Sequence, residues 1–191
     1  SVLNIILNAS LVKYGGDLAL SAIGIVTSIQ TLILMPITGL MQGQQPLISY
    51  NYGALKMERV KETLKYAIIG ATMIALIGFI AVQFFTKSIV YMFNDEADVV
   101  KLCSHALHIW FMCLPLIGAQ VMCANYFQAI GKIKISSVLN LLRQIIILIP
   151  CIIIFSSIIG LDGIFIAVPV ADLSAFIITV LLLKNALKKE A

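Results

Sequence analysis

The sequence is divided by long runs that contain almost no charged residue. Five such runs follow one another: residues 18–55, 66–86 and 102–131 without any Asp, Glu, Lys or Arg, then 135–161 with only Arg143 and 164–183 with only Asp172. A helix needs roughly 20 apolar residues to cross the hydrocarbon core of a bilayer. The runs therefore predict an all-α integral membrane protein.

The composition supports this class and excludes others. The chain is 61% hydrophobic and 12% charged, whereas soluble domains are about 45–50% apolar and about 25% charged. The surplus apolar surface must face lipid. The net charge of +4 does not indicate a nucleic-acid partner, because the basic residues lie in short loops and form no stripe interleaved with aromatics.

We predict a single transmembrane domain over 1–191, a bundle of six helical segments. The expected spans are 1–12, 18–40, 64–86, 102–130, 135–158 and 164–184, with an irregular extension of the second span to residue 55. The first segment would make a helix of only about 18 Å, too short for a core of about 30 Å. We therefore expect the natural chain to begin earlier, with this helix truncated.

Lysine and arginine alternate between the loops and give an orientation. One set of loops carries nine of them: Lys56, Arg59, Lys61, Lys65, Lys132, Lys134, Lys184, Lys188 and Lys189. The other set carries three: Lys13, Lys87 and Lys101. Basic loops stay on the cytoplasmic side, so we expect a multi-pass protein of the cell (inner) membrane with its C-terminus in the cytoplasm.

All five prolines lie inside the apolar segments, where we expect helix breaks. They are Pro36, Pro46, Pro115, Pro150 and Pro169. Membrane helices tolerate proline where neighbours or cavity water satisfy the freed carbonyls. Kinked helices favour a transporter over a rigid anchor, although kinks that only improve packing are the alternative.

Two charges inside the predicted spans need an explanation. Arg143 and Asp172 each lie about nine residues into consecutive antiparallel segments, so they reach a similar depth. Intramembrane charges are usually paired or functional. One hypothesis is a structural pair that neutralises itself. The other is the polar wall of a transport cavity, extended by Asn140 and Gln144 and with Asp172 as the candidate proton carrier.

Uncharged polar residues add further candidates for the cavity wall. They are Gln42, Gln45, Tyr50 and Asn51 after the second span, and Gln120, Asn125, Tyr126 and Gln128 in the fourth. Glutamine and asparagine do not face hydrocarbon without cost, so a cavity or a partner helix should receive them. His105 and His108 lack the third ligand that zinc needs, and we predict neither a metal site nor a cofactor.

Several stretches, in order along most of the chain, resemble one transporter family. They are Gly16–Ala22, Met35-Pro36, Gln42–Ile48, Tyr50–Ala54, Tyr126–Lys132, Leu141–Gln144 and Ala171-Asp172. Residues 42–54, QGQQPLISYNYGA, are the most specific of them. The chain resembles the C-terminal half of a MATE (multidrug and toxic compound extrusion) transporter of the MepA-like branch.

The resemblance implies a twelve-helix protein in which this chain supplies helices 7–12, the C-terminal lobe. Its partners would be the N-terminal six-helix lobe, the lipid bilayer and small cationic or amphipathic substrates, exported by alternating access in exchange for H+ or Na+. One branch of the family carries acids in helices 7 and 10. This chain has Ile117 at the best-matching place and no acid in residues 1–12, so that cation site is not carried over.

Two other functions are compatible with the same pattern. A flippase for lipid-linked oligosaccharides or peptidoglycan precursors would have a similar two-lobed build but a large cationic cavity. A non-transporting membrane scaffold subunit would tolerate apolar replacement of Arg143, Asp172 and Gln45. No motif of an enzyme is present, and we do not expect an enzyme.

Overall fold

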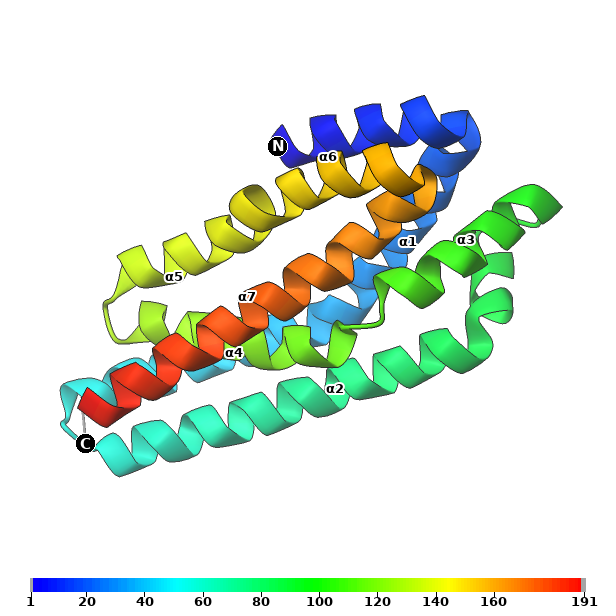
Figure 1. The fold of residues 1–191 in the computed structure, drawn as a ribbon. Coiled ribbons are helices and arrows are strands. Elements are labelled where there is room, and N and C mark those ends of the chain that lie inside the picture. The colour runs from blue at the N-terminus through cyan, green and yellow to red at the C-terminus, as the bar shows by residue number, and fades with distance from the viewer. Residues whose placement is uncertain (1, 190–191) are drawn as a thin grey trace.

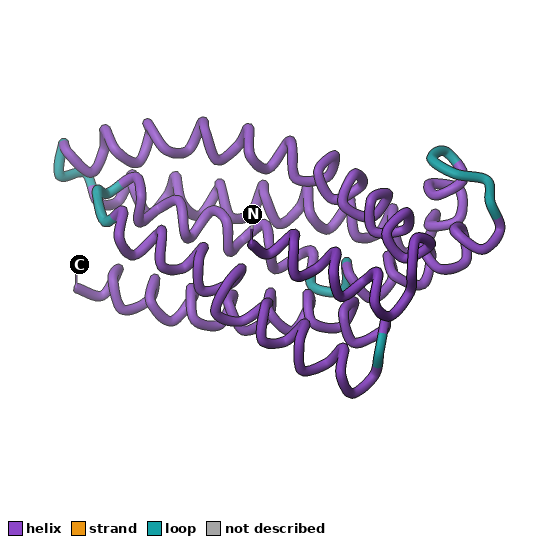
Figure 2. The backbone as a smooth tube through the Cα atoms, turned by 90° about the horizontal axis from the view of Figure 1, so that it is seen from above, coloured by secondary structure: helices purple, strands orange, loops and turns teal. Residues whose placement is uncertain are grey.

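The computed structural model describes residues 2–189, and these are helical apart from short turns (Figure 2). The elements are α1 (Val2–Gly53), α2 (Met57–Tyr91), α3 (Ala97–Trp110), α4 (Leu114–Ala129), α5 (Ile133–Leu141), the π-helix η1 (Leu142–Ile147), α6 (Leu148–Ile159) and α7 (Leu161–Lys189). The predicted all-α fold class is confirmed.

Helix α1 consists of two arms joined at a sharp bend. Gly16 has φ 62° and ψ −155°, a conformation that glycine adopts without the steric penalty of a Cβ. The first arm, residues 2–15, lies beside α6, and the second arm, residues 17–53, turns back into the bundle (Figure 1). The bend falls between the first two expected segments, 1–12 and 18–40, and it leaves a space between the two arms.

The prolines behave differently from one another. Pro115 follows a break at residues 111–113, and α3 and α4 meet there at 52°. The helix break predicted at Pro36 and Pro46 is wrong, because α1 stays helical through both and runs on to Gly53, where we expected an irregular stretch. Pro169 likewise lies inside α7. In a lipid environment the backbone must satisfy its own polar groups, so helix continues wherever sterics allow.

The number of spans differs from the six expected. Four helices, α1, α2, the α5–α6 unit and α7, are long and apolar enough to cross a membrane, and the bent α3–α4 pair brings the number to five. The bend in α1 accounts for the difference, because its first arm is too short to count as a span of its own. The count of six is not confirmed for residues 2–189.

Small residues set the closest helix contacts. A Cβ added to Gly118 would lie 2.5 Å from the Ala71 carbonyl oxygen, so α4 touches the backbone of α2. Gly163 is tighter, since its Cβ would lie 2.1 Å from the Phe155 carbonyl oxygen. Such contacts let membrane helices pack without a hydrophobic driving force.

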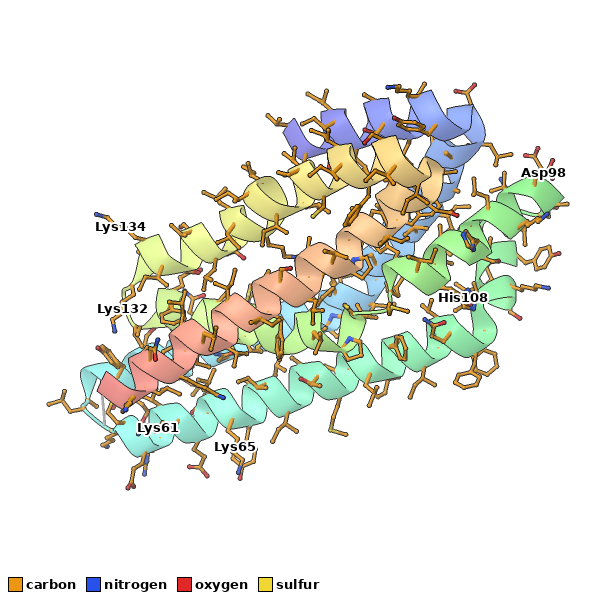
Figure 3. The ribbon with its side chains drawn as sticks, in the orientation of Figure 1. Lys61, Lys65, Asp98, His108, Lys132 and Lys134 are labelled. Atoms are coloured by element: carbon orange, nitrogen blue, oxygen red, sulfur yellow. The ribbon has the colours of Figure 1, made fainter. Side chains whose placement is uncertain are left out.

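The charged loops separate to the two ends of the bundle. Lys61, Lys65, Lys132 and Lys134 lie at the end that also holds the C-terminus, and Asp98 lies at the opposite end (Figure 3). The alternation of loops inferred from charge is thus present in the fold. That the lysine-rich end faces the cytoplasm stays a prediction.

Candidate functional site

A partly polar hollow opens between the two arms of α1 and the helices that face them. Its volume is about 270 Å³. The lining residues come from both arms of α1, the end of α3, η1, α6 and α7: Leu3, Asn4, Leu7, Thr27, Gln30, Trp110, Arg143, Gln144, Leu148, Ile152 and Val168. A second hollow, lined in part by Asn4, Asn8 and Thr27, adjoins it. Apolar walls with a few polar groups are typical of ligand sites.

The backbone that carries Arg143 is a π-helix within an otherwise α-helical span. Residues 142–147 have this form, and Pro150 follows in the first turn of α6. Pro150 has no N–H to donate to the carbonyl four residues earlier, so the regular pattern is already interrupted here. Single π turns within helices are frequent at functional sites. Arg143 and Gln144 both start from this widened turn.

Arg143 and Asp172 form an ion pair across η1 and α7. The Arg143 Nε donates to Asp172 Oδ1 at 2.6 Å. The Asp172 side chain is only 1% exposed, whereas 22% of the Arg143 side chain is exposed. Among the described residues nothing bonds Asp172 Oδ2. The ion pair, which was one of the two hypotheses from the sequence, is therefore formed. The Arg143 guanidinium lies between the Asp172 carboxylate and the hollow.

A second polar contact, between α1 and α3, lies at the wall of the hollow. The Trp110 indole Nε1 donates to Gln30 Oε1 at 3.3 Å. An indole nitrogen is a donor only, so the atom of Gln30 that faces it must be the carbonyl oxygen. The amide NH₂ group of Gln30 is left as a donor on a residue that lines the hollow.

Three of the predicted wall residues are buried between helices instead. Gln120, Asn125 and Tyr126 lie inside the packing of α4. Asn125 Nδ2 donates to the Met41 carbonyl oxygen of α1 at 3.2 Å. Of the two alternatives, a cavity or a partner helix, the structure places these three residues against partner helices, because other helices surround the fourth segment. Gln44, which is not among the predicted wall residues, makes a similar bond through its Nε2 to the Met122 carbonyl oxygen.

The other predicted residues lie away from the hollow. Of these, Gln42, Tyr50, Gln128 and Asn140 are exposed, and Gln45 and Asn51 are partly buried. Gln42 continues a row of exposed polar side chains on the second arm of α1, formed by Thr27, Thr31, Thr38 and Gln42. Their spacings of four, seven and four place them on one helical face. We call this row the α1 polar face.

Several lining residues were not predicted. Asn4, Asn8, Thr27, Gln30 and Trp110 belong to this group. Asn4 and Asn8 are one helical turn apart in an apolar segment, which is the same signal used for the later glutamines. Their position opposite Arg143 follows from the bend at Gly16. Within residues 2–189 no group of three or more His, Cys, Asp or Glu could hold a metal ion.

The sequence matches the MatE family over residues 1–154. The chain belongs to the MatE family. The family inferred from the sequence is thereby confirmed. Similar curated proteins include the multidrug export protein MepA of Staphylococcus aureus strain MSSA476, 29% identical over 182 residues, which cover 93% of this chain and 40% of that protein. MepA of Staphylococcus haemolyticus strain JCSC1435 is 27% identical over 171 residues, covering 90% and 37%.

Solved MatE-family structures share the fold. An outward-facing MATE transporter matches with a TM-score of 0.92 at 23% identity, covering 99% of this chain and 43% of that chain. The multidrug transporter DinF-BH, solved as a complex, matches with a TM-score of 0.82 at 33% identity, covering 96% and 44%. This chain thus spans about two fifths of the length of the MatE-family proteins that it resembles.

Proposed function

We propose that the chain is the C-terminal lobe of a MatE-family antiporter that exports cationic or amphipathic compounds in exchange for H+ or Na+. The observation that carries the proposal is the buried Arg143–Asp172 pair at the wall of a hollow within the spans. A charge buried at this depth is costly and usually marks a substrate or ion pathway. Asp172 is the proposed proton carrier.

The size of the hollow supports a site completed by another lobe. Sites for drug-sized ligands usually measure roughly 300–1,000 Å³, and the hollow measures about 270 Å³. The α1 polar face continues from the hollow along the outside of the chain. The amide of Gln42 on this face is exposed, and an amide exposed to hydrocarbon is costly, so water suits that surface better than lipid. We infer that the N-terminal lobe lies opposite this face, with a water-filled cleft between.

A proton mechanism follows from the pair. While Asp172 is ionised, its Oδ1 holds the Arg143 guanidinium at the wall. Protonation of Asp172 removes the charge that attracts the guanidinium, so Arg143 becomes free to move within the hollow. Alternating access would then couple this movement to rocking of one lobe against the other. Arg143 and Asp172 thus act as one unit.

Drug efflux by the full-length transporter tests the proposal. Cells that express Asp172→Asn or Arg143→Ala should lose most of their efflux of an amphipathic cationic dye. Asp95→Asn is the matched control, because Asp95 is an exposed aspartate in the loop outside the helices, and it should retain efflux. Unchanged efflux in both site variants, at equal expression, would remove the pair from the mechanism.

A further inference from the structure

We propose that the hollow recognises the carboxylate of amphipathic zwitterionic compounds, with Arg143 as the residue that binds it. This inference rests on the proposed transport function and names a substrate class for the same hollow. It is carried by the donors and charges that line the hollow.

The lining supplies hydrogen-bond donors and a positive charge. A guanidinium has five N–H donors, and the bond to Asp172 uses the one on Nε. No other described residue accepts a hydrogen bond from Arg143, so the four N–H groups on Nη1 and Nη2 remain for a ligand. The Gln30 amide adds two more, because its carbonyl oxygen accepts from Trp110 and its NH₂ group is left on a residue that lines the hollow.

Negative charge is missing from the same surface. None of the described lining residues is Asp or Glu. The nearby carboxylate of Asp172 is 1% exposed and already bonded by Arg143. A cationic group entering from the hollow would meet the guanidinium first and would have to displace it. This lobe therefore offers a simple cation no free partner, and the cationic end of a substrate must be met elsewhere.

A planar carboxylate fits these donors. The two terminal nitrogens of a guanidinium match a carboxylate as a fork, which is the strongest common form of this contact. The apolar and aromatic part of the wall, formed by Leu7, Trp110, Leu148 and Ile152, suits a ring system. The geometry thus favours a flat amphipathic molecule whose carboxylate points toward η1.

The test compares a rhodamine that has a free carboxylate with the methyl ester of the same dye. Binding of each is measured by fluorescence anisotropy to the purified full-length transporter in phosphatidylcholine nanodiscs. The free acid should bind about tenfold more tightly than the ester, the effect of charge-assisted hydrogen bonds that the ester cannot make. Equal binding, or tighter binding of the ester, overturns the inference.

Variants assign the preference to Arg143. Asp172→Asn should keep or increase the preference for the acid, because Arg143 loses its competitor. The double variant R143Q/D172N carries neither charge, so it avoids an unpaired buried carboxylate, and it should bind both dyes with the affinity of the ester. A preference that survives in the double variant places the carboxylate elsewhere and overturns the assignment.

Further outcomes distinguish a failure of this inference from a failure of the proposed function, and substrate binding from lipid binding. If the wild-type transporter neither binds nor exports either dye, the proposed function itself fails. If it binds and exports both dyes without preference, the proposed function stands and only the carboxylate assignment falls. The titration is repeated in phosphatidylglycerol nanodiscs, where loss of the preference would assign the oxyanion to a lipid headgroup and overturn the substrate assignment.

Discussion

Separating Arg143 from Asp172 should destabilise the protein more than removing both. In Arg143→Gln the Asp172 carboxylate, 1% exposed, loses the one hydrogen bond that the described residues give it. Removing one member of a buried ion pair costs about 3–5 kcal/mol. In Asp172→Asn the arginine remains, but 22% of its side chain is exposed and it borders the hollow. An imperfectly satisfied group of this kind costs about 1–3 kcal/mol.

The double variant R143Q/D172N replaces both charges by amides of similar size. It leaves no uncompensated charge, so it should cost less than Arg143→Gln alone, about 1 kcal/mol. The coupling energy from the double-mutant cycle should then be about 3 kcal/mol or more. Unfolding of the purified full-length transporter by sodium dodecyl sulfate in mixed micelles, followed by tryptophan fluorescence or circular dichroism, measures all four proteins.

The reasoning is refuted if the two single effects simply add in the double variant. Independent sites show coupling energies below about 0.5 kcal/mol. Arg143 and Asp172 would then not form the bond that the hollow and the proton mechanism depend on.

Two further predictions concern packing and the hollow. Gly118→Ala places a methyl group 2.5 Å from the Ala71 carbonyl oxygen and should cost about 1–3 kcal/mol in the same unfolding assay. Gly39→Ala is its control, since a Cβ there meets nothing within 4 Å, and an equal loss in both would contradict this packing. Trp110→Phe removes the donor that orients Gln30 and should reduce the preference for the carboxylate dye about two- to threefold, as one neutral hydrogen bond implies. A preference unchanged in the anisotropy titration would exclude this role of Gln30.

The sequence was sufficient for the all-α membrane class and the family, and it singled out Arg143 and Asp172 while leaving open whether they pair. Long runs with almost no charged residue are typical of membrane segments, and Arg143 and Asp172 lie at a similar depth in consecutive antiparallel segments. Helix breaks were predicted poorly from proline alone. Pro36 and Pro46 remain inside a continuous helix while Gly16 makes the sharp bend, because the backbone leaves helical φ/ψ at Gly16 and keeps it at both prolines.

The wall of the hollow could be predicted only in part. Arg143 and Gln144 line it, and their charge and spacing drew attention to them. Asn4 and Gln30 lie on different arms of α1 and line the same hollow only because the chain bends at Gly16. A local sequence pattern does not give the direction of that bend. Asn125 carries an equally polar side chain but bonds Met41, because helix neighbours, and not residue type, decide between a cavity and a packing contact.

The most direct test asks whether the α1 polar face meets water at mid-membrane. Thr31 lies on that face. Ile77 is 66% exposed on α2, and its neighbour Gly78 packs against Ile33, so the two positions lie at a similar depth. In a full-length transporter without other cysteines, Thr31→Cys should react with a membrane-impermeant maleimide, because the reactive thiolate forms in water, and Ile77→Cys should not. Labelling of Ile77→Cys but not Thr31→Cys would contradict a water-filled cleft on this side of the lobe.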